Sequence, residues 1–175
     1  HAEGDARLLQ SGIPFTSLRA CSFMQNFLTF YAAGIRADGS IYQCTGDVPT
    51  ALIDTRDIGD VAVALLTTPS TTYHRQILEL TGPEAINYSQ AAATLGNVLG
   101  RTVRYVDVPN EAYRQALIGF GVPDWGADEV VNIYGRGFYR EGGGAKVTST
   151  VSDILGRPAR SFERFAEDHV SYFTP

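Results

Sequence analysis

Residues 11–26 of the chain read SGIPFTSLRACSFMQN. Gly12 stands where the residue after a helix C-terminus is expected, and Pro14 prevents a preceding helix from continuing. We therefore predict a first helix over residues 1–11 and a short strand over residues 15–19. A second helix, residues 21–31, is predicted by a stripe of aromatic side chains at helical spacing: Phe23, Phe27, Phe30 and Tyr31.

Strands and helices continue to alternate along the rest of the chain. Asp57 is a candidate N-cap for one helix, and Asn87 with Gln90 three residues later forms a capping-box pattern at the start of another. Further strands are predicted at residues 41–44, 77–80 and 103–108, and further helices at 57–66, 87–99, 110–120, 124–138 and 161–173. This order predicts an α/β protein with a partly parallel sheet.

The composition narrows the classes of protein to which the chain can belong. Its 175 residues include 14 lysines and arginines against 19 aspartates and glutamates, a net charge of −5. The basic residues are scattered, so we expect no nucleic-acid partner. No apolar run approaches the roughly 20 residues that cross a bilayer, so we expect no membrane span. Cys21 and Cys44 are too few for a disulfide framework, which favours reduced thiols in a cytoplasmic protein.

Several motifs that would identify a reaction are absent from the sequence. The glycines at 135, 137 and 142–144 do not follow a predicted strand, so we interpret them as breaks rather than as a phosphate-binding loop. A tyrosine four residues before a lysine activates many reductases, but the only lysine, Lys146, has Gly142 at that place. No nucleophile elbow G-x-S-x-G occurs. The sequence therefore leaves the catalytic residues unknown.

Charged and metal-binding residues give no strong signal either. The histidines His1, His74 and His169 lack zinc-ligand spacing, so we expect no metal site, and we interpret His169 as a core or rim histidine. Residues 54–57, DTRD, can be viewed as a charged site. Carboxylates also satisfy the free N–H groups at a helix N-terminus, and we favour that interpretation.

The best candidate for a ligand site is CSFMQN, residues 21–26, directly after the strand at 15–19. Ligands of open α/β sheets bind outside the carboxyl ends of the strands. An aromatic ring with a nearby carboxamide at that place can flank a planar ligand and form a hydrogen bond to it. The alternative is that Phe23 belongs to the aromatic core together with Phe27 and Phe30, and the sequence leaves both interpretations open.

Taken in order, several stretches of the chain resemble one family. They are residues 11–19 (SGIPFTSLR), 23–26 (FMQN), 53–58 (IDTRDI), 80–84 (LTGPE), 99–101 (LGR) and 156–158 with 161–162 (GRP and SF). Together they resemble the second half of NmrA-like proteins. These form an atypical short-chain dehydrogenase/reductase group that includes NAD(P)H:quinone oxidoreductases and redox-sensing regulators. The resemblance extends over nearly the whole chain.

The resemblance implies a fold with two parts. Residues 1–80 would form the remainder of a Rossmann-like NAD(P)-binding sheet with its helices. Residues 81–175 would form mainly a small substrate-side α/β subdomain and the C-terminal helix. The N-terminal half that carries the glycine motif in this family is expected to be absent from the chain, which would then be a fragment.

The resemblance also implies site residues. The loop after Arg19 would approach the nicotinamide end of NADPH or NADH, with Cys21, Phe23 and Asn26 on the cofactor side. Phe23 would also face the substrate, and the other candidate walls of the substrate pocket are Tyr113, Trp125 and Tyr134. The alternative for these three aromatic residues is a place in the core. Ala20 replaces the proline that family members often have after the arginine.

Three functions follow from the resemblance as expectations. The first is an NAD(P)H-dependent oxidoreductase that reduces quinones or a similar small carbonyl acceptor. A quinone product can take its protons from solvent, so the absent tyrosine–lysine pair is compatible with that reaction. The second is a non-catalytic NAD(P)H-binding redox sensor, and the third is an inactive truncated fragment.

Two further expectations concern partners of the chain. We expect the strand at residues 15–18 to pair with sheet strands outside this chain. The chain alone would then form a homo-oligomer or stay attached to a separate N-terminal fragment. We also expect weak NAD(P)H binding by the chain alone, because the phosphate-holding loop would lie elsewhere.

Overall fold

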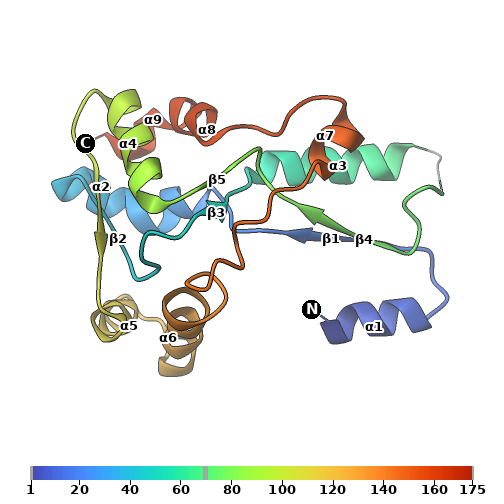
Figure 1. Cartoon of the computed structure of the whole chain (residues 1–175), viewed down its shortest axis with the longest axis horizontal. Helices are drawn as coiled ribbons and strands as arrows, with labels where there is room; N and C mark the ends of the chain where they lie inside the picture. The colour runs from blue at the N-terminus through green and yellow to red at the C-terminus, as the bar shows by residue number, and fades with distance from the viewer. Residues whose placement is uncertain (1, 69–70, 175) are drawn as a thin grey trace.

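The structure, a computed structural model, describes residues 2–68 and 71–174. His1, the predicted start of the first helix, lies outside the described residues. The strands are β1 (Thr16–Ala20), β2 (Ser40–Gln43), β3 (Thr50–Ala51), β4 (Gln76–Leu80), β5 (Ala85–Ile86) and β6 (Arg104–Asp107). The helices are α1 (Ala2–Gln10), α2 (Ala32–Asp38), α3 (Thr55–Thr67), α4 (Tyr88–Leu99), α5 (Asn110–Gly119), α6 (Asp124–Val131), α7 (Thr150–Leu155), α8 (Phe162–Asp168) and α9 (Val170–Phe173), with π-helical η1 (Phe27–Tyr31) and η2 (Asn132–Arg136). The α/β class is confirmed (Figure 1).

Two parallel strand pairs form the framework. β1 pairs with β4 in parallel, with Thr16 opposite Gln76 and Ala20 opposite Leu80. β2 pairs with β6 in parallel, and the short strands β3 and β5 are antiparallel. The partly parallel sheet is thereby confirmed. Figure 1 shows α1 on one side of the β1–β4 pair, and α3 and α7 on the other.

The pairing of β1 gives this strand a partner within the chain. All five of its residues pair with β4, and the expectation that β1 also pairs with strands outside the chain stays a prediction. The sequence did not show this because the two strands are about 60 residues apart and neither contains a signal for its partner. Among the described residues, β4 is the one strand that pairs with β1.

Two apolar clusters hold the elements together. In the larger one, Phe27 is fully buried, with its ring centroid 4.7 Å from that of Phe162 and 5.1 Å from that of Tyr31. It joins η1, α4 and α8. The smaller cluster contains Ile53, Val61, Leu80 and Val151, and it packs α3 and α7 against β4. Burial of such side chains supplies most of the favourable free energy of folding.

The aromatic stripe that predicted a helix over residues 21–31 is only partly confirmed. Helical structure begins at Phe27 and continues through Gly34 to Asp38. Phe27 and Tyr31 are buried, whereas Phe30 is 63% exposed, so Phe30 is not a core residue. The bridge between Phe23 and Ile53 explains the late start, because that pairing keeps the first residues extended.

Other element boundaries also differ from the prediction. α3 begins at Thr55, and its N-cap is Asp54 rather than Asp57, since the Asp54 side chain accepts from the Arg56 backbone N–H. The last predicted helix breaks at His169 into α8 and α9, and the helix predicted to reach residue 138 ends at Arg136. Helix α7 had no sequence signal that we used. The capping box of Asn87 and Gln90 is confirmed, with both reciprocal bonds present.

Within residues 2–68 and 71–174, no helix is both long and apolar enough to cross a membrane.

Candidate functional site

A cavity of about 210 Å³ lies at the carboxyl ends of β1 and β4. Arg19, Ala20 and Cys21 form one wall, and Glu79, Leu80 and Thr81 form another. The Cys21 backbone N–H donates to the Leu80 carbonyl at 3.1 Å, which extends the pairing by one residue. Because β1 and β4 are parallel, both chains leave the sheet at this edge, where ligands of α/β sheets bind.

Aromatic side chains from the segment after η2 form a further wall of this cavity. Phe138 and Tyr139 line it together with Gly143, Gly144 and Lys146. Tyr139 stacks on Tyr134 with ring centroids 4.6 Å apart and planes 5° apart. Burial raises the pKa of Tyr139 to about 12, so its hydroxyl keeps its proton at neutral pH. Of these residues, only Tyr134 was predicted as a site residue, because residues 142–144 were interpreted as a break and Phe138 as part of a helix.

Cys21 is the one predicted cofactor-side residue that lines the cavity. Burial raises the pKa of its thiol to about 11, which leaves the sulfur uncharged at neutral pH. Burial raises the pKa of the other cysteine, Cys44, to about 11 as well. Both are free cysteines, in agreement with the reduced thiols expected from the sequence.

Phe23 and Asn26 lie in the same loop but outside the cavity lining. The Phe23 side chain is 40% exposed, although its neighbours Ser22 and Met24 are buried. This placement argues against the alternative that Phe23 belongs to the buried core. Asn26 is half-buried and directly precedes η1.

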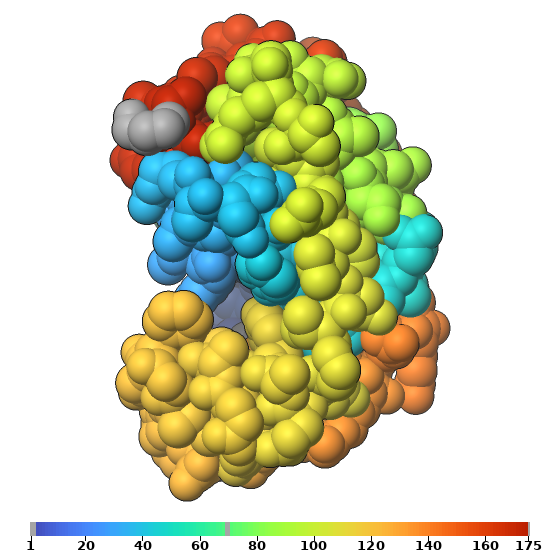
Figure 2. All heavy atoms as spheres, turned by 90° about the vertical axis from the view of Figure 1, so that its left-hand side faces the viewer, coloured from blue at the N-terminus to red at the C-terminus, as the bar shows by residue number. Residues whose placement is uncertain are grey.

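The predicted substrate-side aromatic residues come from α5, α6 and η2. Tyr113 is half-buried, and burial raises its pKa to about 12. Trp125 is 74% exposed, so it is not a core residue. Neither residue lines the cavity at Cys21. Figure 2 shows a hollow between the light blue atoms of the segment that contains α2 and the gold atoms of the segment that contains α5 and α6.

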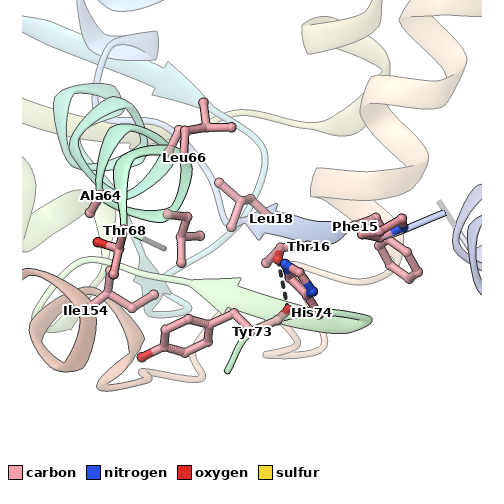
Figure 3. Close-up of a pocket in the computed structure, with 12 residues that line it drawn as sticks. Phe15, Thr16, Leu18, Ala64, Leu66, Thr68, Tyr73, His74 and Ile154 are labelled. Atoms are coloured by element: carbon pink, nitrogen blue, oxygen red, sulfur yellow. Dashed lines mark hydrogen bonds between the residues drawn. The ribbon is translucent and has the colours of Figure 1, made fainter. Parts of the chain in front are cut away.

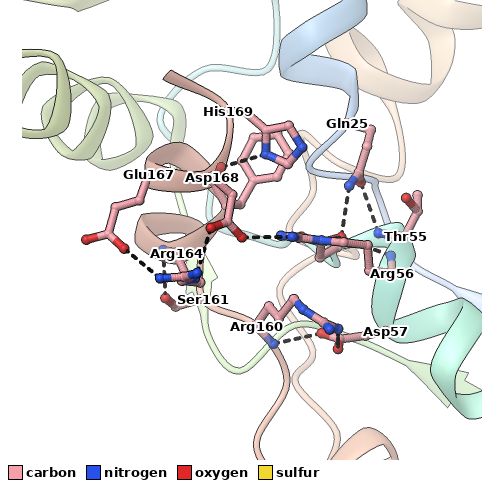
Figure 4. A network of polar contacts seen from close by, with 12 residues as sticks. Gln25, Thr55, Arg56, Asp57, Arg160, Ser161, Arg164, Glu167, Asp168 and His169 are labelled. Carbon is pink, nitrogen blue, oxygen red and sulfur yellow. Dashed lines mark hydrogen bonds and ion pairs between the residues drawn. The ribbon is translucent and has the colours of Figure 1, made fainter. Parts of the chain in front are cut away.

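Backbone and side-chain hydrogen bonds fix the loop at residues 21–26. The Met24 N–H donates to the Ile53 carbonyl at 2.8 Å, and the Ile53 N–H donates to the Ser22 carbonyl at 2.9 Å. The Gln25 side chain then bonds Asp54 and Thr55 at the start of α3. The DTRD segment is therefore a helix N-terminus, as expected, and it also supports the loop (Figure 4).

A larger cavity, of about 500 Å³, lies at the other end of β1. Its walls are mostly apolar and include Leu18, Leu65 and Ile154 (Figure 3). The Thr16 hydroxyl donates to the Tyr73 carbonyl at 2.8 Å, so that polar group is already satisfied. The cavity lies near the amino ends of the strands and offers little chemistry, so we place the candidate site at the carboxyl ends.

No group of three or more His, Cys, Asp or Glu side chains that could hold a metal ion occurs among the residues the structure describes. Of the histidines, His169 is half-buried and its Nδ1 lies 2.8 Å from the Phe165 carbonyl oxygen. This position at the rim of the aromatic core agrees with the interpretation of His169 as a core or rim residue.

The parallel strand pairs make this an α/β protein with a cavity at the carboxyl ends of β1 and β4, and its fold matches that of NAD(P)-binding Rossmann-type proteins. A profile of the NmrA-like family matches residues 6–136. The chain belongs to the NmrA-like family.

Two similar proteins are an NAD(P)H azoreductase of Xenophilus azovorans and a (4-alkanoyl-5-oxo-2,5-dihydrofuran-3-yl)methyl phosphate reductase of Streptomyces griseus. The first is 38% identical over 173 residues, which are 98% of this chain and 58% of that protein. The second is 36% identical over 175 residues, 99% of this chain and 59% of that protein. The chain therefore spans about three fifths of the length of these relatives.

Two solved structures show the same fold. The NADPH-dependent quinone oxidoreductase QOR2 of Escherichia coli, complexed with NADPH, has a TM-score of 0.85 and 25% identity, covering 98% of this chain and 58% of that chain. NmrA, a negative transcriptional regulator in complex with NAD, has a TM-score of 0.69 and 19% identity, covering 94% of this chain and 55% of that chain.

Proposed function

We propose that the chain forms the acceptor-side part of an NAD(P)H-dependent oxidoreductase that reduces a quinone or a similar small carbonyl compound. The observation that carries the proposal is the cavity at the carboxyl ends of β1 and β4, with Cys21, Phe138 and Tyr139 in its walls. The azoreductase and the quinone oxidoreductase named above support a reduced nicotinamide as the hydride donor.

The residues present fit the nicotinamide end of the cofactor better than its phosphate end. Cys21 is uncharged and Tyr139 keeps its proton, and the charged residues of the lining are paired, Arg19 with Asp5 and Lys146 with Glu79. No glycine-rich turn leads from a strand into a helix N-terminus within the described part of the chain. Such a turn binds the pyrophosphate in Rossmann folds. A separate segment would therefore have to hold the phosphates.

In this proposal each group of residues has its own role. Cys21, Phe23 and Asn26 hold the nicotinamide, and the Asn26 carboxamide can donate to and accept from a planar amide. Phe23, Tyr113, Trp125 and Tyr134, which lie outside the lining of the cavity at Cys21, would contact the acceptor. The bound cofactor supplies a hydride, and the protein contributes orientation and a site with little water. The two parts of the chain, residues 1–80 and 81–175, would serve the cofactor and the acceptor respectively.

The experiment that tests the proposal follows the absorbance of NADPH and of NADH with the complete product of the gene. We expect oxidation that depends on added quinone. Cofactor binding without turnover for any quinone or azo acceptor would favour the redox-sensor alternative. Absence of both binding and turnover would contradict the proposal.

We also propose a cytoplasmic location and no nucleic-acid or membrane partner. The two free cysteines and the scattered basic residues support this. For the 175-residue chain on its own, we propose self-association or attachment to a separate N-terminal fragment through the edge of β1 that β4 leaves open.

A further inference from the structure

Gln25 connects the candidate loop to α3 through both ends of its side-chain amide. Its Nε2 donates to Asp54 Oδ1 at 2.9 Å, and its Oε1 accepts from the Thr55 backbone N–H at 3.0 Å. The orientation of the amide follows from its partners, because a carboxylate only accepts and a backbone N–H only donates. Both hydrogen-bonding functions of the amide are therefore used in this bridge.

The bridge completes a short pairing between residues 22–25 and residues 53–55. Two backbone hydrogen bonds join Ser22 and Met24 to Ile53. Met24 is 1% exposed and anchors the loop in the core, and the side chains of an extended segment point alternately to opposite sides. Phe23 is consequently directed outward. Asn26 is the next residue after Gln25, whose side chain is bonded to Asp54 and Thr55.

The partner of Gln25 is itself held rigidly. Asp54 is fully buried, and the Arg56 side chain donates to it through Nε at 3.0 Å and through Nη2 at 2.6 Å. Arg56 Nη1 also donates to Asp168 on α8 at 2.7 Å. Figure 4 shows Gln25 above the start of α3, with Arg56 extending from there toward α8. Gln25 thus links a loop with an exposed aromatic ring to the buried Asp54, whose ion pair with Arg56 extends to Asp168 on α8.

We propose that Gln25 is a positioning residue, which holds Phe23 and Asn26 at the carboxyl edge of β1 and thereby sets the affinity of the site for its planar ligands. This inference rests on the proposed function. Gln25 does not touch the ligand in this account, because its amide is committed to Asp54 and Thr55. Without the bridge, the loop keeps its two backbone bonds to Ile53 and its backbone bonds to η1, but it loses the side-chain link between residue 25 and the start of α3.

The test uses Gln25→Ala in the complete gene product, with Gln90→Ala as the matched control. Gln90 also uses its side chain to accept from a backbone N–H, that of Asn87 at 2.9 Å, but it belongs to the capping box of α4. We expect Gln25→Ala to raise the KM for NAD(P)H and for the quinone by about tenfold, with a smaller change in kcat. We expect Gln90→Ala to leave both KM values unchanged.

Hydrogen exchange of the unliganded proteins gives a second readout. Amides of the loop at residues 21–26 and of Thr55 should exchange faster in Gln25→Ala, and those of α4 should do so in Gln90→Ala. Unchanged KM values or unchanged loop exchange in Gln25→Ala would overturn the inference. A wild-type protein that neither binds nor oxidises NAD(P)H would instead overturn the proposed function, so the two failures are distinguishable.

Discussion

Cys21 lies in the wall of the candidate site, but its thiol is not activated. Burial raises its pKa to about 11. At about pH 8 the thiolate fraction is then roughly two hundredfold lower than for an ordinary cysteine with a pKa of about 8.5. We expect iodoacetamide to alkylate Cys21 correspondingly slowly in the native protein and rapidly in urea, as peptide mass spectrometry can measure. Rapid native alkylation would contradict the burial of this wall.

Gly82 follows the carboxyl end of β4 and allows a close approach of two backbone segments. A Cβ built on it would lie 1.9 Å from the Leu52 carbonyl oxygen, so Gly82→Ala must displace backbone. We expect a loss of about 2–3 kcal/mol in the free energy of unfolding, measured by urea titration.

The control for this change is Gly59→Ala, because nothing lies within 4 Å of a Cβ on Gly59 in the middle of α3. We expect Gly59→Ala to raise the free energy of unfolding by about 0.5–1 kcal/mol, since alanine favours the helix. Equal effects of the two substitutions would show that the close contact at Gly82 is not present.

For single residues, a role could be predicted from the sequence where the hydrogen-bond partner lies close in the chain. Asn87 and Gln90 are three residues apart, and their capping box is present. Asp57 was misassigned as a cap because its partners, Arg157 and Arg160, lie about 100 residues further along the chain. Tyr139 was missed for a similar reason, since only the folded chain brings it to the carboxyl edge of β1.

At the scale of elements, Asp57 fixes the C-terminal segment to α3. It is fully buried, and it accepts from Arg157 Nη2 at 2.9 Å and from the Arg160 backbone N–H at 2.7 Å. Asp57→Asn removes the charge of a buried acceptor, whereas Arg157 and Arg160 are partly exposed and still pair with Asp60. We expect the substitution to lower the free energy of unfolding by about 1.5–3 kcal/mol in urea titrations, the range for hydrogen bonds to charged groups.

The control for Asp57→Asn is Glu3→Gln, which removes the same charge from an exposed pair with Arg7. We expect Glu3→Gln to lower the free energy of unfolding by less than about 0.5 kcal/mol. A similarly small loss in Asp57→Asn would contradict the view that this carboxylate anchors the C-terminal segment.

The ion pairs of Arg56 with Asp54 and Asp168 make the free energy of unfolding depend on pH. Burial acts to raise the pKa of Asp54, but its hydrogen bonds with Arg56 outweigh that effect and keep the pKa below the ordinary 3.8. The hydrogen bond from Arg56 likewise lowers the pKa of Asp168. A carboxyl group with a lowered pKa in the folded state stabilises above its unfolded pKa, and that contribution is lost as the pH falls through the folded value.

We therefore expect the free energy of unfolding to decrease as the pH drops below about 4, and to decrease less in Arg56→Ala, which lacks the cation. Urea titrations over a pH series measure both slopes. Identical slopes would show that Arg56 does not set these two pKa values.

Element positions were predicted better than element boundaries. Most predicted strands and helices overlap observed ones, because apolar periodicity and glycine or proline breaks are local signals. The start of η1 at Phe27 depends instead on the pairing of Phe23 with Ile53. The break at His169 and the helix α7 likewise had no pattern that we recognised in the sequence.

For the molecule as a whole, the open edge of β1 leads us to predict self-association of the chain. β4 covers one edge of β1, and no described residue pairs with the other. An unpaired strand edge favours association with another chain. We expect the isolated 175-residue chain to self-associate in size-exclusion chromatography with light scattering. A monomer with cooperative thermal unfolding would contradict this prediction.

If the loop after β1 holds the cofactor, substitutions in that loop must weaken NADPH binding, so the affinity for NADPH is the most direct test. NADPH is titrated into the complete gene product as wild type, Asn26→Ala and Phe23→Ala, with the exposed neighbour Thr29→Ala as the control. We expect about tenfold weaker NADPH binding in Asn26→Ala and in Phe23→Ala, and wild-type affinity in Thr29→Ala. Wild-type affinity in both Asn26→Ala and Phe23→Ala would contradict this prediction.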